Sequence, residues 1–383
     1  MNYPIQDIFL EYYEAAKTQY PVSQDMHKAA SAIMNCKTSA LGGNVSVCQD
    51  CGHSETHYNS CRNRHCPCCQ GLVKEKWIDQ RKSEVIDAPY FHIVFTVPEE
   101  LNPLIYANKK LLYSLLYKAS ADTLMELGKD KKYLNASIGF MSILHTWGQA
   151  LNFHPHIHSI VLGGGLTKDL KFKTVKNDQF LFPVRVVSRL FRGKFMDALK
   201  KLYKSGKLLF SGSSLKFQQP GEFQKLVDLL YVKEWIPHIK ETFKGAKNVI
   251  EYLGRYTHRI AISNARIVSI SDKGITFKVK NYRKQGESTQ MTLEPTEFIR
   301  RFLMHILPKG FVKIRYYGIL SNRSKKAKLK ICRNFIKRNY PKPLLEGLTT
   351  TQILLALFGV DIHKCPKCSN RNFNMIRSIP QRE

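Results

Sequence analysis

Two closely spaced pairs of cysteines near the start of the chain place the strongest constraint on its fold. The pairs Cys48-x-x-Cys51 and Cys66-x-x-Cys69 are separated by fourteen residues, and a glycine follows Cys51. Four thiolates at this spacing can surround one tetrahedral zinc ion, which contributes on the order of 10 kcal/mol to the folding of a small unit. We therefore predict a structural zinc site formed by Cys48, Cys51, Cys66 and Cys69, in preference to disulfides or buried free thiols.

Further cysteines and histidines lie around these pairs. The candidates for a second, interleaved zinc site are Cys36, Cys61, His65 and His27. Cys68 is a spare thiol, and Cys365-x-x-Cys368 near the other end is half of a zinc ribbon whose missing ligands the sequence does not place. Seven of the ten cysteines lie between Cys36 and Cys69, which favours reduced, metal-binding thiolates over a secreted disulfide framework.

The charge balance indicates a polyanionic partner. The 383 residues include 60 Lys and Arg against 30 Asp and Glu, a formal net charge of +30. Such an excess repels itself unless a polyanion neutralises it, so nucleic acid is the first partner to consider and an anionic membrane surface the second. Because no apolar run approaches the ~18 residues of a membrane span and the start lacks the pattern of a signal peptide, we expect a soluble cytoplasmic protein without a membrane partner.

Apolar periodicity predicts a mixture of helices and strands, an α+β chain. Helical spacing covers residues 5–35, the segment after the cysteines, 101–127, 190–203, 222–235 and 249–262. Residues 91–97 are rich in β-formers, and 137–147 with 153–162 predict an antiparallel hairpin ended by Gly163–Gly165. A second hairpin is expected over 266–280. We divide the chain into a helical and zinc-binding domain (1–88), a central catalytic domain (89–297) and a basic C-terminal region (298–383).

Three histidines occur at alternate positions of one predicted strand. His154, His156 and His158 share a strand face, whereas Pro155 and Ile157 point to the other. Imidazoles that converge from a rigid strand can form a divalent-metal site with room for a phosphate oxygen, and Pro155 favours an edge strand. His156 and His158 are the leading ligands. The third ligand is open between His154 and three alternatives, Gln149, His145 and His258.

Two tyrosines supply candidate nucleophiles. Tyr252 and Tyr256 are four residues apart in the predicted helix 249–262, so both phenols lie on one helix face. A phenol with a pKa near ~10 is a weak nucleophile, and a metal that polarises a scissile phosphate lowers the demand on it. The same positions also fit an apolar core stripe, but the neighbouring Arg255 and Arg259, together with the upstream histidines, favour a site.

A long stretch of the C-terminal part lacks carboxylates. From Phe298 to Leu345 there is no acidic residue, while fourteen are Lys or Arg. The absence of acidic residues from so basic a stretch favours contact with a phosphate backbone over an ordinary solvated surface. The predicted DNA-binding residues are Arg255, Arg259, Arg300, Arg301, Lys325, Lys326, Lys328 and Lys330.

Three motifs together resemble a known family. The segments CRNRHCPCCQ, HPHIH and YLGRYTHRIAIS occur in the order found in the HUH transposases of the IS91 family, rolling-circle insertion-sequence enzymes with two tyrosines. The resemblance runs from the first helices to about Tyr317. It implies a central HUH-type antiparallel sheet flanked by helices, with His156 and His158 as the metal pair and Tyr252 and Tyr256 as the nucleophiles.

The chain departs from the family pattern at two positions. Cys68 stands where members commonly have a basic residue, and Asn44 where they often have histidine. The second departure weakens the case for a second zinc ion.

The resemblance implies a metal-dependent tyrosine endonuclease and strand transferase. The enzyme would nick and rejoin single-stranded DNA at transposon ends and at the target through 5′-phosphotyrosine intermediates, with Mg²⁺ or Mn²⁺ as the catalytic ion and zinc as the structural one. Two alternatives stay open. One is a plasmid replication initiator or relaxase with the same chemistry, and the other is a non-enzymatic zinc-containing DNA-binding regulator. The sequence does not define the oligomeric state.

Overall fold

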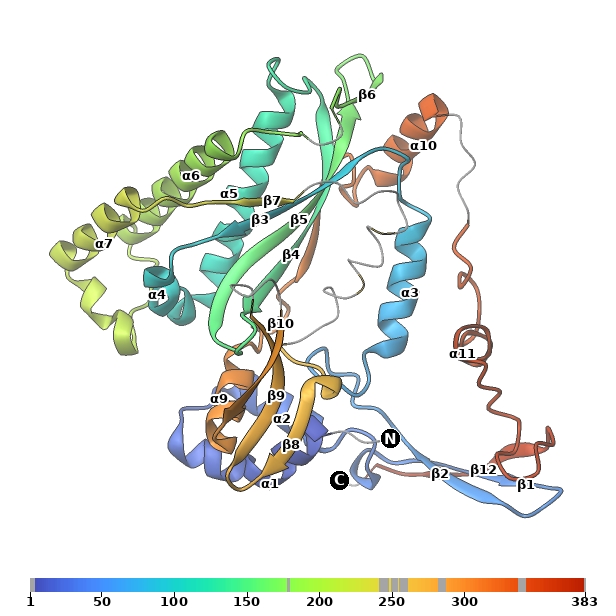
Figure 1. The fold of residues 1–383 in the computed structure, drawn as a ribbon. Coiled ribbons are helices and arrows are strands. Elements are labelled where there is room, and N and C mark those ends of the chain that lie inside the picture. Colours follow the sequence, from blue (N-terminus) through green and yellow to red (C-terminus); the bar gives the residue numbers. More distant parts are fainter. Residues whose placement is uncertain are drawn as a thin grey trace.

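The computed structural model confirms the α+β class, with helices and antiparallel sheets in one chain (Figure 1). It describes residues 4–177, 180–240, 248, 254, 261–281, 287–336 and 342–381. The predicted helix 249–262 falls outside these residues, apart from Gly254, Ala261 and Ile262. Within the described residues, no helix is long and apolar enough to cross a membrane.

The N-terminal helices pack against a segment from much later in the chain. This unit contains α1 (Pro4–Gln19), α2 (Gln24–Met34), α9 (Pro295–Met304) and a three-stranded sheet of β8 (Ile267–Ser271), β9 (Gly274–Asn281) and β10 (Glu287–Leu293). Phe9 of α1, Phe277 of β9 and Phe302 of α9 are buried in one core. The hairpin predicted over 266–280 is present, and β10 extends it by a strand that the sequence patterns did not predict.

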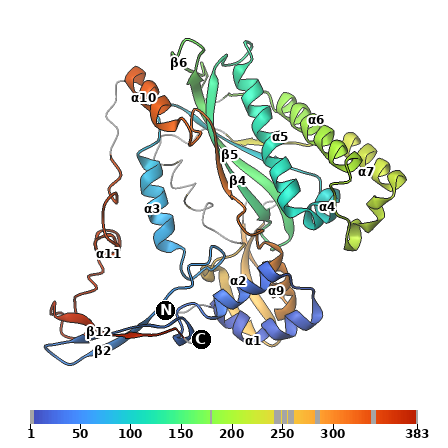
Figure 2. The same ribbon diagram turned by 180° about the vertical axis from the view of Figure 1, so that it is seen from behind.

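A second three-stranded sheet joins the two ends of the chain. Its order is β12 (Phe373–Ile379), β1 (Gly43–Cys48) and β2 (Ser54–Tyr58), all antiparallel. Figures 1 and 2 show both termini beside this sheet. The chain then enters α3 (Gly71–Lys82), which leads to the central sheet.

The central sheet is antiparallel and carries the histidines. Its order is β11 (Ile314–Gly318), β4 (Ser137–Trp147), β5 (Phe153–Leu166), β3 (Tyr90–Thr96) and β7 (His238–Lys240), with β6 (Phe172–Thr174) paired to β5. The predicted β4–β5 hairpin is confirmed, but β5 continues through the glycines that were expected to end it. A Cβ on Gly163 would lie 2.7 Å from the ring of Phe91, and one on Gly165 2.5 Å from the carbonyl oxygen of Ser137. The glycines therefore permit close approach of neighbouring strands.

The expectation that Pro155 marks an edge strand was wrong. β5 lies in the interior of the sheet, between β4 and β3. β3 pairs with β5 no further than His156, and the β4–β5 register shifts between His145 and Trp147. Pro155 therefore sits at an irregularity just past the end of one neighbour, where its missing N–H costs no ladder hydrogen bond.

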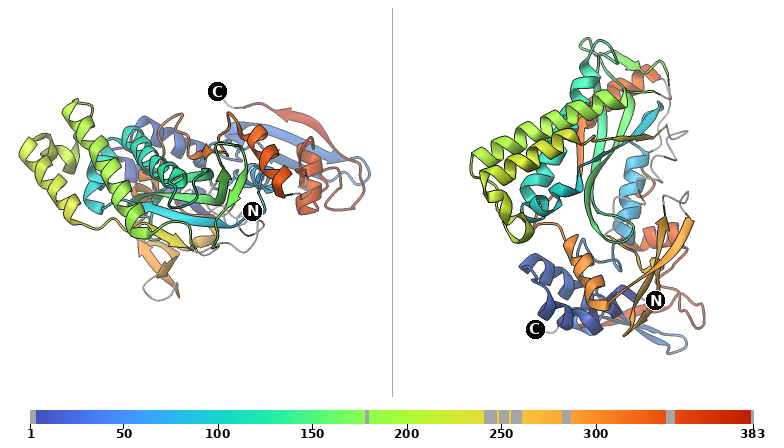
Figure 3. Two further views of the ribbon diagram at one scale, coloured as in Figure 1. Left: turned by 90° about the horizontal axis from the view of Figure 1, so that it is seen from above. Right: turned by 60° about the vertical axis from the view of Figure 1, so that its left-hand side comes forward.

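Helices cover the two faces of this sheet unequally. One face packs on α4 (Asn102–Ala107), α5 (Lys109–Lys129), α6 (Val184–Lys204) and α7 (Pro220–Val232). On the other face, Met141 and Ile160 belong to one buried cluster with Cys332 of α10 (Lys325–Ile336), and Trp77 of α3 packs against this cluster. Figure 3 shows α6 and α7 on one side of the sheet and α3 on the opposite side. The alternation of β4 and β5 places the histidines on the α3 side, beyond the end of the apolar core.

Elements pair across the predicted domain boundaries. β11 and α10 come from the segment 298–383, yet they belong to the central sheet and its core. After α11 (Thr350–Phe358), β12 of the same segment joins β1. The three-domain division stays a prediction about folding units, while the structure shows that pairing between distant segments builds each sheet.

Candidate metal centre

Three histidines from two neighbouring strands converge on one point. His145 of β4 is paired in register with His156 of β5, and His158 follows two residues later on the same face. One ligand nitrogen from each of the three lies within 4.8 Å of the others. The Nε2 atoms of His156 and His158 are 3.0 Å apart. Antiparallel pairing thus gathers three imidazoles that are far more widely spaced in the sequence than on the sheet.

Hydrogen bonds orient the two β5 histidines toward this point. The Nδ1–H of His156 donates to the carbonyl oxygen of His154, at 2.6 Å, which leaves Nε2 with its lone pair. The Nδ1 of His158 lies 2.8 Å from Nε2 of His92 on β3, and the two rings are stacked. Partners of this kind at the second ring nitrogen are typical of metal-binding histidines, because they fix the tautomer and the ring orientation.

The surroundings keep these imidazoles neutral. Burial lowers the pKa of His156 to about 3. Burial, with the nearby ring of His145, holds the pKa of His158 well below its ordinary value. Because a metal binds the neutral form of histidine, the site carries no proton that a cation would first have to displace at pH 7.

The geometry fits a divalent cation. Two nitrogens at about 2.1 Å from one ion, at adjacent corners of an octahedron, are separated by roughly 3.0 Å, which matches the spacing of His156 and His158. Of the candidates that the sequence left open for a third ligand, His145 is the one that lies in this cluster. His154, the first candidate for that role, is not in the cluster and instead supplies the carbonyl oxygen that orients His156.

The remaining alternatives for the third ligand do not join the cluster in the described residues. Gln149 accepts a hydrogen bond from the backbone N–H of Lys280, and His258 lies outside the described residues. His92 was missed, although its place in the β-rich segment 91–97 was predicted. Its relation to His158 depends on strand order, which local periodicity does not reveal.

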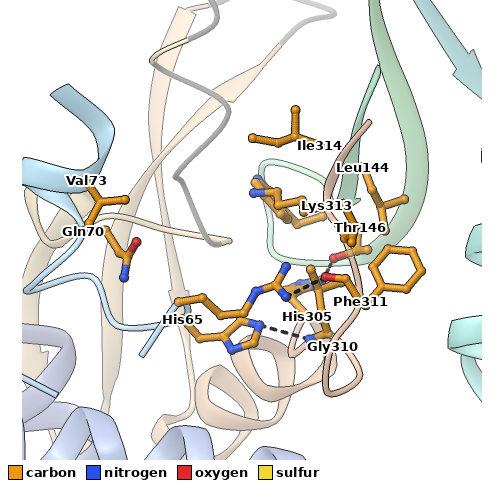
Figure 4. Close-up of a pocket in the computed structure, with 14 residues that line it drawn as sticks. His65, Gln70, Val73, Leu144, Thr146, His305, Gly310, Phe311, Lys313 and Ile314 are labelled. Atoms are coloured by element: carbon orange, nitrogen blue, oxygen red, sulfur yellow. Dashed lines mark hydrogen bonds between the residues drawn. The ribbon is translucent and has the colours of Figure 1, made fainter. Parts of the chain in front are cut away.

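A cavity of about 480 Å³ is lined by Leu144, Thr146 and Trp147, the β4 residues on either side of His145 (Figure 4). Its walls come from β4, the segment between α9 and β11, and the start of α3. Lys313 lines it with its Nζ 5.0 Å from the ring centroid of Trp147, which in turn stacks on His145 at 4.7 Å. Burial, reinforced by Arg64, lowers the pKa of Lys313 to about 7. Two cationic side chains therefore face a cavity next to the candidate metal centre.

Neutral, fully partnered groups complete the cavity wall. The Nε2–H of His305 donates to the carbonyl oxygen of Leu151, and its Nδ1 accepts from the hydroxyl of Thr146. Burial lowers its pKa to about 3. The cavity charge at neutral pH therefore comes from Lys313 and Arg64 rather than from histidine.

The predicted nucleophiles Tyr252 and Tyr256, with Arg255 and Arg259, lie outside the described residues. Gly254, between the tyrosines, is described and buried, and a Cβ added to it would lie 2.3 Å from Cδ1 of Ile78 on α3. α3 also contacts the histidine face of the sheet, since Arg81 donates to the hydroxyl of Tyr316 on β11. Gly254 is therefore held against the helix that covers that face.

The structure corrects the predicted zinc grouping. Cys66 and Cys69 lie with Cys36 and Cys61, whereas Cys48 and Cys51 lie with Cys365 and Cys368 at a separate location. The physical reason is that β1 and β2 carry the first pair away along a hairpin, while the second pair remains at the start of α3.

The cluster of Cys36, Cys61, Cys66 and Cys69 has the features of a thiolate site. The sulfurs of Cys61 and Cys69 are 3.8 Å apart, and backbone N–H groups donate to the sulfurs of Cys36, Cys61 and Cys66. The histidines predicted beside Cys36 and Cys61 have other partners. His27 bonds the hydroxyl of Tyr13, and His65 accepts from the backbone N–H of Leu307. Cys68 is outside both four-cysteine groups, as predicted for a spare thiol.

The basic residues fall into two sets. Arg300 and Arg301 both form ion pairs with Glu297, and Lys325 forms one with Glu84. The charges of these three basic residues are therefore used within the fold. On α10, Lys326 and Lys330 are exposed and Lys328 is half-buried. The second set is the more available to a polyanion.

Comparison with known proteins identifies two matching families. Residues 139–328 match the family described as "Putative transposase", which covers the histidine strands and β11. Residues 8–97 match a "Transposase zinc-binding domain", which includes Cys36, Cys61, Cys66 and Cys69. This domain and the cysteine clusters together support structural zinc.

Individual relatives agree with these matches. The chain is 42% identical to "Putative transposase y4qJ" of Sinorhizobium fredii over 95% of its own length and 92% of that protein. It is 28% identical to "Transposase for insertion sequence element IS801" of Pseudomonas savastanoi pv. phaseolicola, over 90% and 82%. A solved structure of the conjugative relaxase TrwC in complex with oriT DNA is similar over 47% of this chain and 68% of its own, with 13% identity and a TM-score of 0.26. On the long, near-complete match to y4qJ and the two family matches, this chain belongs to the IS91 family of transposases.

Proposed function

We propose that this transposase nicks and rejoins single-stranded DNA at transposon ends through 5′-phosphotyrosine intermediates. The observation that carries the proposal is the convergence of His145, His156 and His158 beside a cavity lined by Lys313 and Arg64. Metal ligands next to the cationic side chains of arginine and protonated lysine form the environment that a reacting phosphodiester needs.

Each part of the site has a role in this proposal. The three imidazoles would hold a divalent cation, Mg²⁺ or Mn²⁺, which would supply positive charge beside the scissile phosphate and so lower the demand on a weak nucleophile. Lys313 and Arg64 bind phosphate oxygens of the strand in the cavity. His92 and the carbonyl of His154 fix the orientation of the ligand rings.

Tyr252 and Tyr256 are the proposed nucleophiles. The phenol oxygen of one attacks phosphorus, the bond from phosphorus to the 3′ oxygen breaks, and the products are a 5′-phosphotyrosine and a free 3′-OH. The phosphodiester bond energy is kept, so rejoining needs no ATP. The second tyrosine can cut another strand while the first remains bonded. The contact of Gly254 with Ile78 supports this assignment, because α3 lies on the histidine face.

The test uses purified protein and labelled single-stranded DNA from the element's ends. The reaction is run with Mg²⁺, Mn²⁺ or EDTA and resolved on a denaturing gel. The proposal expects a metal-dependent, protease-sensitive DNA adduct that disappears in Tyr252→Phe/Tyr256→Phe and in His156→Ala.

Two other results would contradict the mechanism. Cleavage without an adduct points to water as the nucleophile in a metallonuclease. Binding without cleavage of verified end sequences points to a regulator. A control with Tyr231→Phe, an exposed tyrosine on α7 away from the histidine face, should retain the adduct.

The basic surface predicts a steep salt response. Binding to single strands falls by ~0.7 log unit per log unit of salt for each phosphate contacted. Replacing the exposed Lys326 and Lys330 with Gln should lower this slope by about 1.4 units while leaving the chemistry of a bound strand intact. An unchanged slope would show that Lys326 and Lys330 of α10 do not contact DNA phosphates.

A further inference from the structure

Four cysteines from opposite ends of the chain meet at the end of the β12–β1–β2 sheet. Cys48 and Cys51 flank the turn after β1, and Cys365 and Cys368 precede β12. The sulfurs of Cys48 and Cys368 are 3.6 Å apart, as are those of Cys51 and Cys365, and all four lie within 4.8 Å of one another. The zinc-binding domain match ends at residue 97 and so contains half of this group.

The sulfur spacing fits one metal ion rather than two disulfides. A disulfide requires about 2.05 Å between sulfurs. Four thiolates at about 2.3 Å from a tetrahedral zinc ion are separated from one another by roughly 3.8 Å. The observed 3.6 Å separations are close to the second value.

The two Cys-x-x-Cys segments also have the same backbone conformation. In the first, the N–H of Cys48 donates to the carbonyl of His53 and the N–H of Gly52 to that of Cys48. In the second, Cys365 and Ser369 make the same two bonds, to Asn370 and Cys365. Gly52 and Ser369 both have positive φ, 68° and 66°. Ser369 adopts a conformation that favours glycine, which indicates that the knuckle shape is imposed by a requirement of the site.

The sheet that joins the termini has almost no hydrophobic core. The buried cluster beneath it contains Cys48, Cys365 and Phe373, with Cys368 at its margin. Most of β12 is exposed, including Met375 and Ile376. A unit this small usually needs a disulfide or a metal to be stable, and the thiolate group occupies the place where a core would be.

We propose that Cys48, Cys51, Cys365 and Cys368 bind a structural zinc ion that fastens the C-terminal segment to the N-terminal domain. This zinc-mediated link between the two segments, the clasp, is extended by polar contacts. Asn372 donates to Asp50 across the two knuckles, and further back the carboxylate of Asp79 on α3 accepts from the backbone N–H groups of Leu344 and Leu345. The chain is thereby held against α3 at residues 344–345 and against β1 through β12. The clasp does not depend on the proposed strand-transfer chemistry.

The test counts zinc ions in the full-length protein. Zinc per chain is measured by mass spectrometry of the purified protein after loosely bound metal is removed. We expect two ions in the wild type and one in Cys365→Ser/Cys368→Ser. The matched control is Cys332→Ala, a buried cysteine of α10 outside both groups, which should retain two. An unchanged count in the double variant would overturn the proposal, as would two disulfides among these cysteines.

A second readout covers the case in which the double variant loses both ions through misfolding. Wild-type protein is loaded with ¹¹³Cd and examined by NMR. Two resonances from sulfur-only sites support the clasp, and a single one contradicts it. In the folded double variant, limited proteolysis should cut the segment that carries β12 faster than in the wild type, whereas the Cys332→Ala control should remain resistant.

Discussion

The Nε2 atoms of His156 and His158 lie 3.0 Å apart on one face of β5, with both Nδ1 atoms engaged elsewhere. Both rings therefore offer their lone pairs to the same point, and His145 completes the set from the neighbouring strand. The first two predictions concern this arrangement.

Removing His145 should abolish tight binding of the divalent cation. We expect His145→Ala to weaken Mn²⁺ binding by more than the roughly 10–100-fold typical of lost outer-shell contacts, because a direct ligand disappears. Calorimetry or electron paramagnetic resonance of Mn²⁺ measures the change. His154→Ala is the matched control, because it keeps the backbone carbonyl that orients His156 and removes only a ring that lies 5.0 Å from the His156 ring and outside the three-histidine cluster. A loss in His154→Ala without one in His145→Ala would show that His154, and not His145, completes the site.

His92 should act as a positioning residue. In His92→Phe the ring stack on His158 can persist, but the 2.8 Å contact with its Nδ1 is lost. We expect metal affinity to fall about 10–100-fold and to recover in part at high Mn²⁺, together with adduct formation. A variant that recovers no activity at saturating metal would indicate a role for His92 in the reaction itself.

The contact between Gly254 and Ile78 gives a test of where the tyrosine segment lies. A Cβ at Gly254 would meet the Ile78 side chain at 2.3 Å, and overpacking of this kind costs about 1–3 kcal/mol. Gly254→Ala should therefore reduce adduct formation, and Ile78→Ala/Gly254→Ala should restore part of it. Gly193→Ala on α6, where nothing lies within 4 Å, should have no effect. If the double variant does not recover, the loss in Gly254→Ala does not come from a clash with Ile78, and Gly254 does not contact α3 in the active protein.

Lys313 should make DNA binding depend on pH. Because burial lowers its pKa to about 7, its positive charge is present below that value and is lost as the pH rises through it. Affinity for single-stranded DNA, measured in EDTA at constant salt, should fall about tenfold from pH 6 to pH 8. His65, with a pKa near 3, is neutral throughout this range, and Arg64 stays charged.

Substitutions at Lys313 test whether its charge causes the pH dependence of DNA binding. Lys313→Arg should bind with little dependence on pH, since a guanidinium remains protonated, and Lys313→Met should bind weakly at every pH. A wild-type pH profile that survives in Lys313→Met would assign the effect to another group.

Local patterns predicted much of this molecule. The alternation of His154, His156 and His158 with apolar residues predicted a strand and placed His156 and His158 on one face, which the structure confirms. The motifs and their order predicted the family. The strand prediction succeeded because strand alternation depends on residues that are neighbours in the sequence, whereas the family prediction came from the resemblance of the motifs.

Other features required the tertiary structure. His145 joins His156 because a hairpin sets their register, and His92 reaches His158 because β3 lies beside β5. The cysteine pairs were assigned to each other by proximity along the chain, whereas the fold pairs Cys48 with Cys368, 320 residues away. The sequence by itself determined which side chains can bind metal and which faces they occupy. Only the tertiary structure decided which of them share an ion, because ligand sets are assembled by contacts between distant segments.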